Sequence, residues 1–462
     1  MADKKETNPN VYEKKTVFEA AGDKVVTDAY EYAKGYMKFL DGAKTEREAV
    51  AIGVRMAENA GYRAWHFGDS LTAGGKYYYN NRGKNLFVFR IGSEPINEGV
   101  RITCAHIDSP RLDLKQNPLF ENSSLCFLKT HYYGGIRKYQ WLALPLALHG
   151  VVVREDGEVV SVTVGEDESD PVMYITDLLP HLAAAENAKP VGTAFQAEKL
   201  NILVGSRPLP EEDKDAVKAN VLAYLREKYG MTEADFQSAE LCIVPAGRAR
   251  DVGFDRSMIC GYGHDDRCCA YPSLTAMLDA DESVHTTMCI LADKEEIGSE
   301  GVSGMQCSLI VDLLAEFAHA LGGNAAAVRA ASRCLSSDVA ATYDPNFDDV
   351  YEKRNAALIN CGVAMCKFTG ARGKSGTSDA SAELVGWVRR CLNGAGVVWQ
   401  TCELGKIDVG GGGTIAKYMA NHNIDTIDLG VPVLSMHAPY EVIAKTDLYE
   451  AYRAFVAFYH FA

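Results

Sequence analysis

Hydrophobic residues recur at helical spacing near the start of the chain, and the pattern then changes to that of strands. From about residue 28 to residue 61, apolar side chains lie three or four positions apart, which is typical of amphipathic helices. Thr45, with Glu48 three residues later, is suited to cap a helix within this stretch. Apolar runs over residues 85–92 and 100–106 predict buried strands, the second of which ends at His106.

Residues 117–246 show a different pattern. Valine-rich arms lie on either side of Asp156-Gly157 and predict a β hairpin over residues 151–164. A helix is expected over residues 211–229. This stretch is interpreted as a partly β insertion.

Alternating strands and helices resume after the insertion. Further helices are expected over residues 308–321, 380–391, 414–421 and 446–459. The predicted fold class is therefore α/β, with one domain formed by residues 1–116 and 247–462 and interrupted by the insertion over residues 117–246.

Composition narrows the class of protein. A chain of 462 residues with 47% hydrophobic and 24% charged residues is typical of soluble globular proteins, and no apolar run approaches the roughly 20 residues of a membrane span. The first residues lack the apolar core of a secretory signal, so a cytoplasmic location is expected. The net charge of −15 argues against nucleic acid or an anionic membrane as a partner.

Cysteine usage argues against a thiolate metal site. The 13 cysteines are scattered and mostly embedded in apolar runs, and no Cys-x-x-Cys pair occurs among them. Reduced, buried thiols are expected.

Two adjacent carboxylates, Glu295 and Glu296, follow the apolar run over residues 286–292. Strand ends are where α/β folds place their chemistry. If the strand continued, the two side chains would point in opposite directions. One could then bind a metal ion while the other transfers protons.

Other imidazoles and carboxylates also follow apolar runs or lie in glycine-rich loops: His106 with Asp108, Asp265, Asp338 and His437. Nitrogen and oxygen donors of this kind suit Zn²⁺ or a similar divalent ion, and more than one ion if a carboxylate bridges. Taken singly, His106 is more often a core histidine and Asp338 a helix N-cap. Their joint occurrence favours a two-metal hydrolytic centre.

These motifs carry a resemblance to a known family. The ordered segments are Cys-Ala-His106-Ile-Asp108-Ser-Pro-Arg, Gly-His-Asp265-Asp266-Arg, Asp293-Lys-Glu295-Glu296-Ile-Gly-Ser, Leu-Ser-Ser-Asp338-Val-Ala and Leu-Ser-Met-His437-Ala-Pro-Tyr-Glu441. Over nearly the whole chain they resemble the aspartyl aminopeptidase and aminopeptidase I family of dinuclear zinc exopeptidases. The resemblance implies a three-layer α/β/α zinc-peptidase domain, an inserted β-rich oligomerisation domain, and a homo-oligomer of twelve subunits.

The resemblance also implies roles for individual residues. Two Zn²⁺ ions per subunit would be held by His106, Asp265, Glu296, Asp338 and His437, with Asp265 bridging. Co²⁺ or Mn²⁺ can share such ligands. Glu295 would be the general base, and Asp108 would orient the ring of His106.

The expected substrates are peptides with a free N-terminus, because carboxylates beside the metals can bind an ammonium group. Within the family that the motifs resemble, some members prefer acidic N-terminal residues and others prefer large neutral ones. His181 would reach the active site of a neighbouring subunit and stabilise the tetrahedral intermediate. Lys374, Lys406 and Gly411 are expected to contact the substrate.

Two other functions stay open on the residues alone. A dinuclear zinc deacylase or carboxypeptidase would use the same ligands, with Arg372, Lys374 or Lys406 as the cation for a substrate carboxylate. A non-catalytic assembly or cargo-binding protein could keep the fold, but it would be expected to lose the base or a ligand, and neither is lost here.

Overall fold

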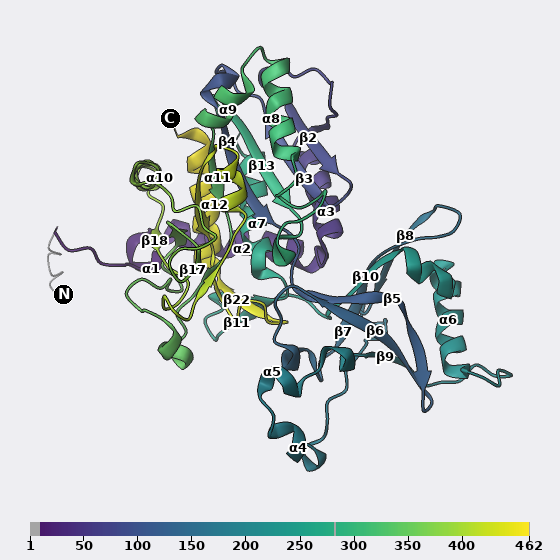
Figure 1. The fold of residues 1–462 in the computed structure, drawn as a ribbon. Coiled ribbons are helices and arrows are strands. Elements are labelled where there is room, and N and C mark those ends of the chain that lie inside the picture. Colours follow the sequence, from purple (N-terminus) through teal and green to yellow (C-terminus); the bar gives the residue numbers. More distant parts are fainter. Residues whose placement is uncertain (1–9, 281–282, 462) are drawn as a thin grey trace.

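The computed structural model describes residues 10–280 and 283–461, which form two parts, each with its own large sheet (Figure 1). The larger sheet has nine strands. Their spatial order is β1 (Arg63–Ala64), β2 (Lys76–Asn81), β3 (Asn85–Arg90), β13 (Thr286–Ala292), β4 (Val100–His106), β14 (Arg333–Ser336), β20 (Asp425–Gly430), β16 (Val363–Cys366) and β18 (Trp399–Thr401).

Helices cover both faces of this sheet. Strand β13 shows why: Cys289 and Leu291 belong to one apolar core, while Met288 and Ile290 belong to another. The first core is shared with α2 (Asp23–Gly42), α3 (Glu46–Asn59), α7 (His264–Leu278), α10 (Ala382–Gly394) and α12 (Lys445–His460). The second is shared with α8 (Leu309–Ala320), α9 (Ala325–Ala331) and α11 (Ala416–Asn421). Alternate side chains of a strand point to opposite faces, so the domain has three layers and the predicted α/β fold class is confirmed.

The four central strands β13, β4, β14 and β20 run parallel to one another. Their carboxyl ends therefore meet at one edge of the sheet. In register, Ala292 at the end of β13 lies beside His106 at the end of β4. Side chains that follow these strands are brought to the same place.

The second part is a six-stranded antiparallel sheet built from residues 111–245. Its order is β8 (Val159–Val164), β7 (Leu146–Val153), β10 (Ala239–Pro245), β5 (Arg111–Asn122), β6 (Leu125–Tyr133) and β9 (Ile202–Gly205). Strands β7 and β8 form the expected hairpin across Asp156-Gly157. Short helices α4 (Ala184–Asn187) and α5 (Val191–Ala194) lie in a segment that projects below this sheet in the view of Figure 1.

The helix expected over residues 211–229 begins later, because α6 spans Ala216–Tyr229. The carboxylate of Glu121 on β5 accepts hydrogen bonds from the backbone N–H groups of Val217 and Lys218, at 2.9 and 3.0 Å. These are unpaired donors of the first helical turn, so a side chain from another element fixes where the helix starts. Such a contact leaves no local pattern in the sequence.

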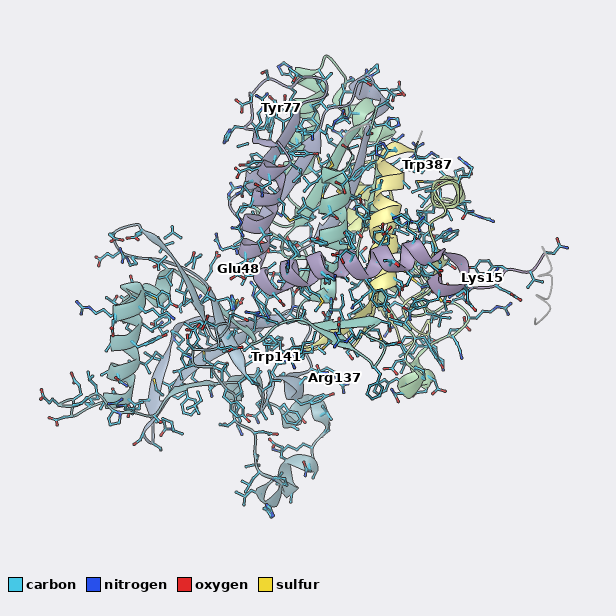
Figure 2. All side chains as sticks on the ribbon, turned by 180° about the vertical axis from the view of Figure 1, so that it is seen from behind. Lys15, Glu48, Tyr77, Arg137, Trp141 and Trp387 are labelled. Carbon is cyan, nitrogen blue, oxygen red and sulfur yellow. The ribbon has the colours of Figure 1, made fainter. Side chains whose placement is uncertain are left out.

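The two parts are joined tightly at the start of α3. Thr45 and Glu48 form the expected capping box there. The same Glu48 lies 2.8 Å from Nδ1 of His149 on β7, whose Nε2 lies 3.1 Å from Glu166. Figure 2 labels Glu48 at this junction. The cap of a helix in one part is thus also an ion-pair partner of a strand in the other.

Smaller elements complete the structure. A five-stranded sheet has the order β11 (Arg250–Val252), β12 (Met258–Gly261), β22 (Glu441–Ala444), β21 (Pro432–Leu434) and β15 (Ala340–Ala341). Among the described residues, the remaining α-helix is α1 (Val17–Ala20), and the remaining strands are the pair β17 (Gly370–Ala371) and β19 (Gly411–Gly412). Within the described ranges, every helix is too short or too polar to cross a lipid bilayer.

Candidate active site

The predicted imidazoles and carboxylates come together at the carboxyl edge of the nine-stranded sheet. His106 is the last residue of β4, Asp338 comes two residues after β14, and His437 follows β21. Asp265 lies in the first turn of α7. Together with Glu295 and Glu296, all four line one open cavity of about 520 Å³.

Glu295 and Glu296 were expected to point in opposite directions if the strand continued through them, but the strand does not continue. Strand β13 ends at Ala292, and Lys294 has a left-handed backbone with φ 68°. The two glutamates therefore lie in a short 3₁₀ turn, Glu295–Ile297. The turn still separates them, because the Glu296 carboxylate faces His437 and both side chains line the cavity.

The donor atoms form two groups that share Asp265. One group is His106, Asp265 and Asp338, and the other is Asp265, Glu296 and His437; within each, the potential ligand atoms lie within 4.8 Å of one another. His106 Nε2 lies 3.1 Å from Asp265 Oδ1 and 3.9 Å from Asp338 Oδ1. His437 Nε2 lies 3.2 Å from Asp265 Oδ2 and 3.6 Å from Glu296 Oε2. Each oxygen of Asp265 therefore faces a different imidazole.

Hydrogen bonds to backbone carbonyls set the orientation of both rings. Nδ1 of His106 lies 2.9 Å from the carbonyl oxygen of Asp108, and Nδ1 of His437 lies 2.7 Å from that of Gly135. A carbonyl oxygen can only accept, so each Nδ1 donates its proton. In the neutral ring, Nε2 then presents a lone pair to the carboxylates. Lone pairs converge in this way where a cation lies between them, and metal-binding histidines are typically held by such a bond.

The charges in the cavity also fit a divalent cation. Burial, the largest effect, raises the pKa of Asp338 and of Glu296 well above the ordinary range. Glu296 Oε1 is buried and accepts no hydrogen bond from the described residues. Buried carboxylates of this kind either hold protons or bind a cation. Two imidazoles and three carboxylates are ligands that suit Zn²⁺.

Glu295 differs from the other carboxylates in its surroundings. Burial raises its pKa to about 7, with Asp108 and Asp265 adding to the rise and the imidazole of His106 opposing it. A group with a pKa near neutrality is suited to accept and return a proton. Glu295 does not belong to either donor group, so its carboxylate faces the cavity without a ligand role in this geometry.

Asp108 holds the glutamate turn. Its Oδ1 accepts the backbone N–H of Glu295 and its Oδ2 that of Glu296, both at 3.1 Å. Asp108 was expected to orient the ring of His106. The ring Nδ1 donates to the backbone carbonyl of Asp108, and the Asp108 carboxylate lies 3.3 Å from the same nitrogen.

Tyr133 connects the second part of the molecule to the glutamate turn. Its hydroxyl donates to Asp108 Oδ2 at 2.9 Å. The guanidinium of Arg111 lies over the Tyr133 ring, 4.1 Å from its centre, and pairs with Glu46 of α3 at 2.9 Å. Tyr133 ends strand β6. The six-stranded sheet therefore reaches the glutamate turn through one phenol and one carboxylate.

Two further residues were missed as supports of the ligands. Glu441 accepts the backbone N–H of Asp265 at 3.0 Å and that of His437 at 2.7 Å. Gly135 supplies the carbonyl that orients His437. Glu441 lies within a recognised motif, so its position was visible in the sequence; Gly135 acts through its backbone, for which the residue type gives no signal.

The expected substrate-binding residues do not all reach the cavity. Gly411 is among its lining residues. In the part of the chain that the structure describes, the lining includes neither lysine: Lys374 Nζ lies 3.1 Å from Asp379, and Lys406 Nζ donates to the carbonyl of Asp349 at 2.7 Å. His181 lies in a 3₁₀ turn of the second part and is absent from the described lining of its own chain's cavity.

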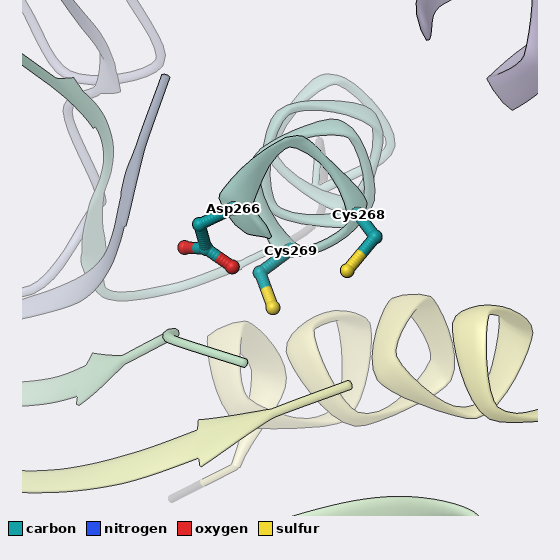
Figure 3. Close-up of side chains that lie close together, drawn as sticks. All are labelled: Asp266, Cys268 and Cys269. Carbon is teal, nitrogen blue, oxygen red and sulfur yellow. The ribbon is translucent and has the colours of Figure 1, made fainter. Parts of the chain in front are cut away.

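A third cluster of potential ligands lies next to the site but faces away from it. Asp266, Cys268 and Cys269 are buried on α7, and Figure 3 shows both thiols pointing toward the C-terminal helix α12. Asp266 Oδ2 accepts the backbone N–H of His106 at 3.2 Å. This cluster supports the end of β4 from behind, and none of its members lines the cavity.

Parallel central strands that present imidazoles and buried carboxylates to an open cavity are typical of metal-dependent hydrolases of the α/β class. Comparison with known proteins specifies the family. A family model described as aminopeptidase I zinc metalloprotease (M18) matches residues 39–459. The chain therefore belongs to this family, as the motifs predicted, and it is a zinc-dependent aminopeptidase.

Individual relatives cover almost the whole chain. A probable M18 family aminopeptidase 1 from Clostridium acetobutylicum is 48% identical over 460 residues, which are 98% of this chain and 99% of the relative. The crystal structure of an M18 aminopeptidase from Thermotoga maritima is 41% identical, with a TM-score of 0.93 over 98% of this chain and 100% of the other. The structure of aminopeptidase I from C. acetobutylicum has 46% identity and a TM-score of 0.91, over 97% and 99% of the two chains.

Proposed function

We propose that each subunit removes the N-terminal residue of peptides at a centre that holds two Zn²⁺ ions, with Glu295 as the general base. The observation that carries this proposal is the placement of Asp265, whose two carboxylate oxygens lie 3.1 and 3.2 Å from Nε2 of His106 and of His437. A carboxylate in this position can bridge two ions. His106 and Asp338 would hold one ion together with Asp265, and Glu296 and His437 would hold the other. Co²⁺ or Mn²⁺ can occupy the same ligands.

Zn²⁺ bound by such ligands supplies Lewis-acid chemistry, polarising a carbonyl group and lowering the pKa of water toward about 7. The protein's own residues do the rest. Glu295 accepts the proton of the attacking water and delivers it to the leaving amine. The carboxylate of Asp108 keeps Glu295 in place by accepting a hydrogen bond from the backbone N–H of Glu295. The carboxylates of the cavity attract the ammonium group of the substrate.

The first side chain of the substrate is acidic or large and neutral. The cavity offers partners for both, because Lys417 lines it together with Leu404 and Met436. Gly411, in the glycine-rich wall, lines the cavity, where its backbone would contact the backbone of the substrate. Lys374 and Lys406 would need to leave their present partners to take part.

We further propose that residues 117–246 form an oligomerisation domain, that residues 1–116 and 247–462 form the peptidase domain, and that twelve subunits assemble. One protein with this fold, mApe1 of S. cerevisiae, is a dodecamer; it is 21% identical, with a TM-score of 0.77. His181 is flanked by exposed leucines, with Leu179 49% and Leu182 67% exposed. Exposed apolar groups beside an exposed imidazole fit a subunit interface at which His181 enters a neighbouring active site.

Metal content and turnover together test the centre. Glu295→Gln should retain two zinc ions per subunit and lose turnover, whereas Glu296→Gln should lose one ion. Glu300→Gln, in the same loop, is the matched control and should keep both. A Glu295→Gln protein that loses zinc as well would refute the assignment of Glu295 as base, and one zinc per subunit in the wild type would refute the two-metal centre.

A substrate panel tests the specificity. Dipeptides with a free N-terminus should be cleaved, and their N-acetylated forms should not; equal cleavage of both would contradict N-terminal recognition and favour a deacylase or carboxypeptidase. The role of His181 can be tested by mixing and reassembling subunits. His181→Phe and Glu295→Gln are each expected to be inactive or slow, and mixed oligomers should regain activity. If mixing restores nothing while both variants assemble, His181 does not act between subunits.

A further inference from the structure

Two cysteines from neighbouring strands meet in the wall of the active-site cavity. Cys366 is the last residue of β16, and Cys402 directly follows β18. The strands are parallel, with Met365 beside Thr401, and the backbone N–H of Cys402 donates to the carbonyl of Met365 at 3.0 Å. The two cysteines thus occupy the next facing position of this ladder, and their Sγ atoms lie 2.9 Å apart.

This pair differs from the other close pair of cysteines in its access to solvent. Cys268 and Cys269 are fully buried within the core and point at α12 (Figure 3). Cys366 and Cys402, by contrast, both line the open cavity of about 520 Å³, and Cys366 is partly exposed. A small oxidant that enters the cavity can therefore reach them.

We propose that Cys366 and Cys402 form a reversible disulfide that lowers peptidase turnover, with a hydroperoxide as the oxidant. One thiol loses its proton to solvent and attacks the outer peroxide oxygen; the O–O bond breaks, the alcohol or water leaves, and a sulfenic acid forms. The second thiol attacks that sulfur, the S–O bond breaks, and water leaves as the S–S bond forms. A dithiol reverses the step by thiol–disulfide exchange.

The backbone already places the two residues for this bond. A disulfide requires sulfur atoms about 2.05 Å apart, so the thiols need to approach by less than about 1 Å. The ladder between β16 and β18 holds their main chains at neighbouring-strand distance. In the resting protein, the hydrogen bond with Cys402, followed by burial, raises the pKa of the Cys366 thiol well above its ordinary value. The Cys366 thiol is therefore protonated in the resting protein and must lose its proton before it can attack an oxidant.

The bond would act on the substrate side of the cavity. Cys402 begins the segment that contributes Glu403, Leu404 and the glycine-rich residues 411–413 to the cavity wall. Linking Cys402 to β16 moves and stiffens this wall. Displacements of about 1 Å can cost up to about 100-fold in rate, so we expect a fall in kcat/KM of about tenfold.

The experiment uses the full-length, zinc-loaded protein treated with hydrogen peroxide and then catalase. After unfolding, the number of free thiols should fall from thirteen to eleven, and peptide mapping should find Cys366 joined to Cys402. Dithiothreitol should restore both the thiols and kcat/KM. The loss of activity rests on the proposed function of the cavity, whereas the thiol count and the mapped bond do not.

Variants separate this bond from general oxidation. Each is compared with itself before and after peroxide, so that any change in basal rate cancels. Cys366→Ser and Cys402→Ser should keep their starting activity after treatment, while the matched control Cys307→Ser, a partly exposed cysteine elsewhere, should lose activity as the wild type does. A mapped bond without a change in kcat/KM, an equal loss in the serine variants, or a treated wild type that retains all its thiols would each overturn the proposal. If a serine variant does not fold, peptide mapping and reversal in the wild type decide the question.

Discussion

The hydroxyl of Tyr133 offers a sharp test of how the second part of the molecule supports the active site. The substitution Tyr133→Phe removes this hydroxyl, and with it the 2.9 Å hydrogen bond to Asp108 Oδ2. Burial and the nearby Asp108 carboxylate raise the pKa of Tyr133 well above its ordinary value, so the hydroxyl keeps its proton and donates. The ring and its contact with Arg111 are retained in phenylalanine.

The size of the effect follows from the contacts of Asp108. A hydrogen bond to a charged group contributes about 1.5 to 3 kcal/mol. Asp108 keeps the backbone N–H groups of Glu295 and Glu296 as donors, so the lower end of that range applies. If about 1.5 kcal/mol is lost from the positioning of the glutamate turn, kcat falls about tenfold, since each factor of ten requires about 1.4 kcal/mol.

Steady-state kinetics, zinc content and thermal unfolding should be measured together for this variant. We expect kcat to fall, KM to change little, and the zinc content to stay at the wild-type value, because no ligand is touched. Tyr132→Phe is the matched control: Tyr132 precedes Tyr133 on β6 and is 44% exposed. An unchanged kcat in Tyr133→Phe, or an equal fall in Tyr132→Phe, would refute the reasoning.

Three further predictions concern the ligands, the junction and the metal. In Gly430→Ala the new Cβ would lie 1.9 Å from the carbonyl oxygen of Asp338, so zinc affinity and turnover should both fall at least about tenfold. Gly386→Ala is the control, because its Cβ would have nothing within 4 Å, and it should change neither quantity. Normal zinc binding by Gly430→Ala would contradict the prediction. Although burial lowers it, hydrogen bonds to its two glutamate partners raise the pKa of His149, so its contribution to stability is full below about pH 6.5 and is lost as the pH rises through the folded value. The difference in free energy of unfolding between wild type and His149→Gln should therefore shrink in chemical denaturation as the pH rises above about 6.5, and a growing difference would show the sign to be wrong. Removing zinc with a chelator should lower the unfolding temperature by about 10 °C, because the buried carboxylates of the cavity then repel one another. Adding zinc should restore the unfolding temperature. An unchanged unfolding temperature would argue against a metal ion at these carboxylates.

Local pattern was enough to predict several of the main elements. Strand ends at His106 and Ala292, the capping box at Thr45 and the hairpin at Asp156-Gly157 each follow from a few neighbouring residues. The direction of the parallel strands then explains why residues far apart in sequence share one cavity.

What the sequence did not predict depends on contacts between distant segments. The start of α6 is set by Glu121. The glutamate turn depends on the left-handed backbone of Lys294, a conformation that usually occurs at glycine and that a lysine does not indicate. Gly135 contributes through a carbonyl that every residue has. Tyr133 is one of two adjacent tyrosines, and only the register of β6 decides which one reaches Asp108.

The spread of the ligands along the chain has a consequence for synthesis. His106 is made early, whereas His437 comes after all nine strands of the large sheet and is held by Glu441 on β22. While the chain is still being translated, the groups around Asp265 stay incomplete. In the proposed centre, the full set of ligands is therefore available only when translation is almost finished, so a nascent chain cannot yet act on its own N-terminus.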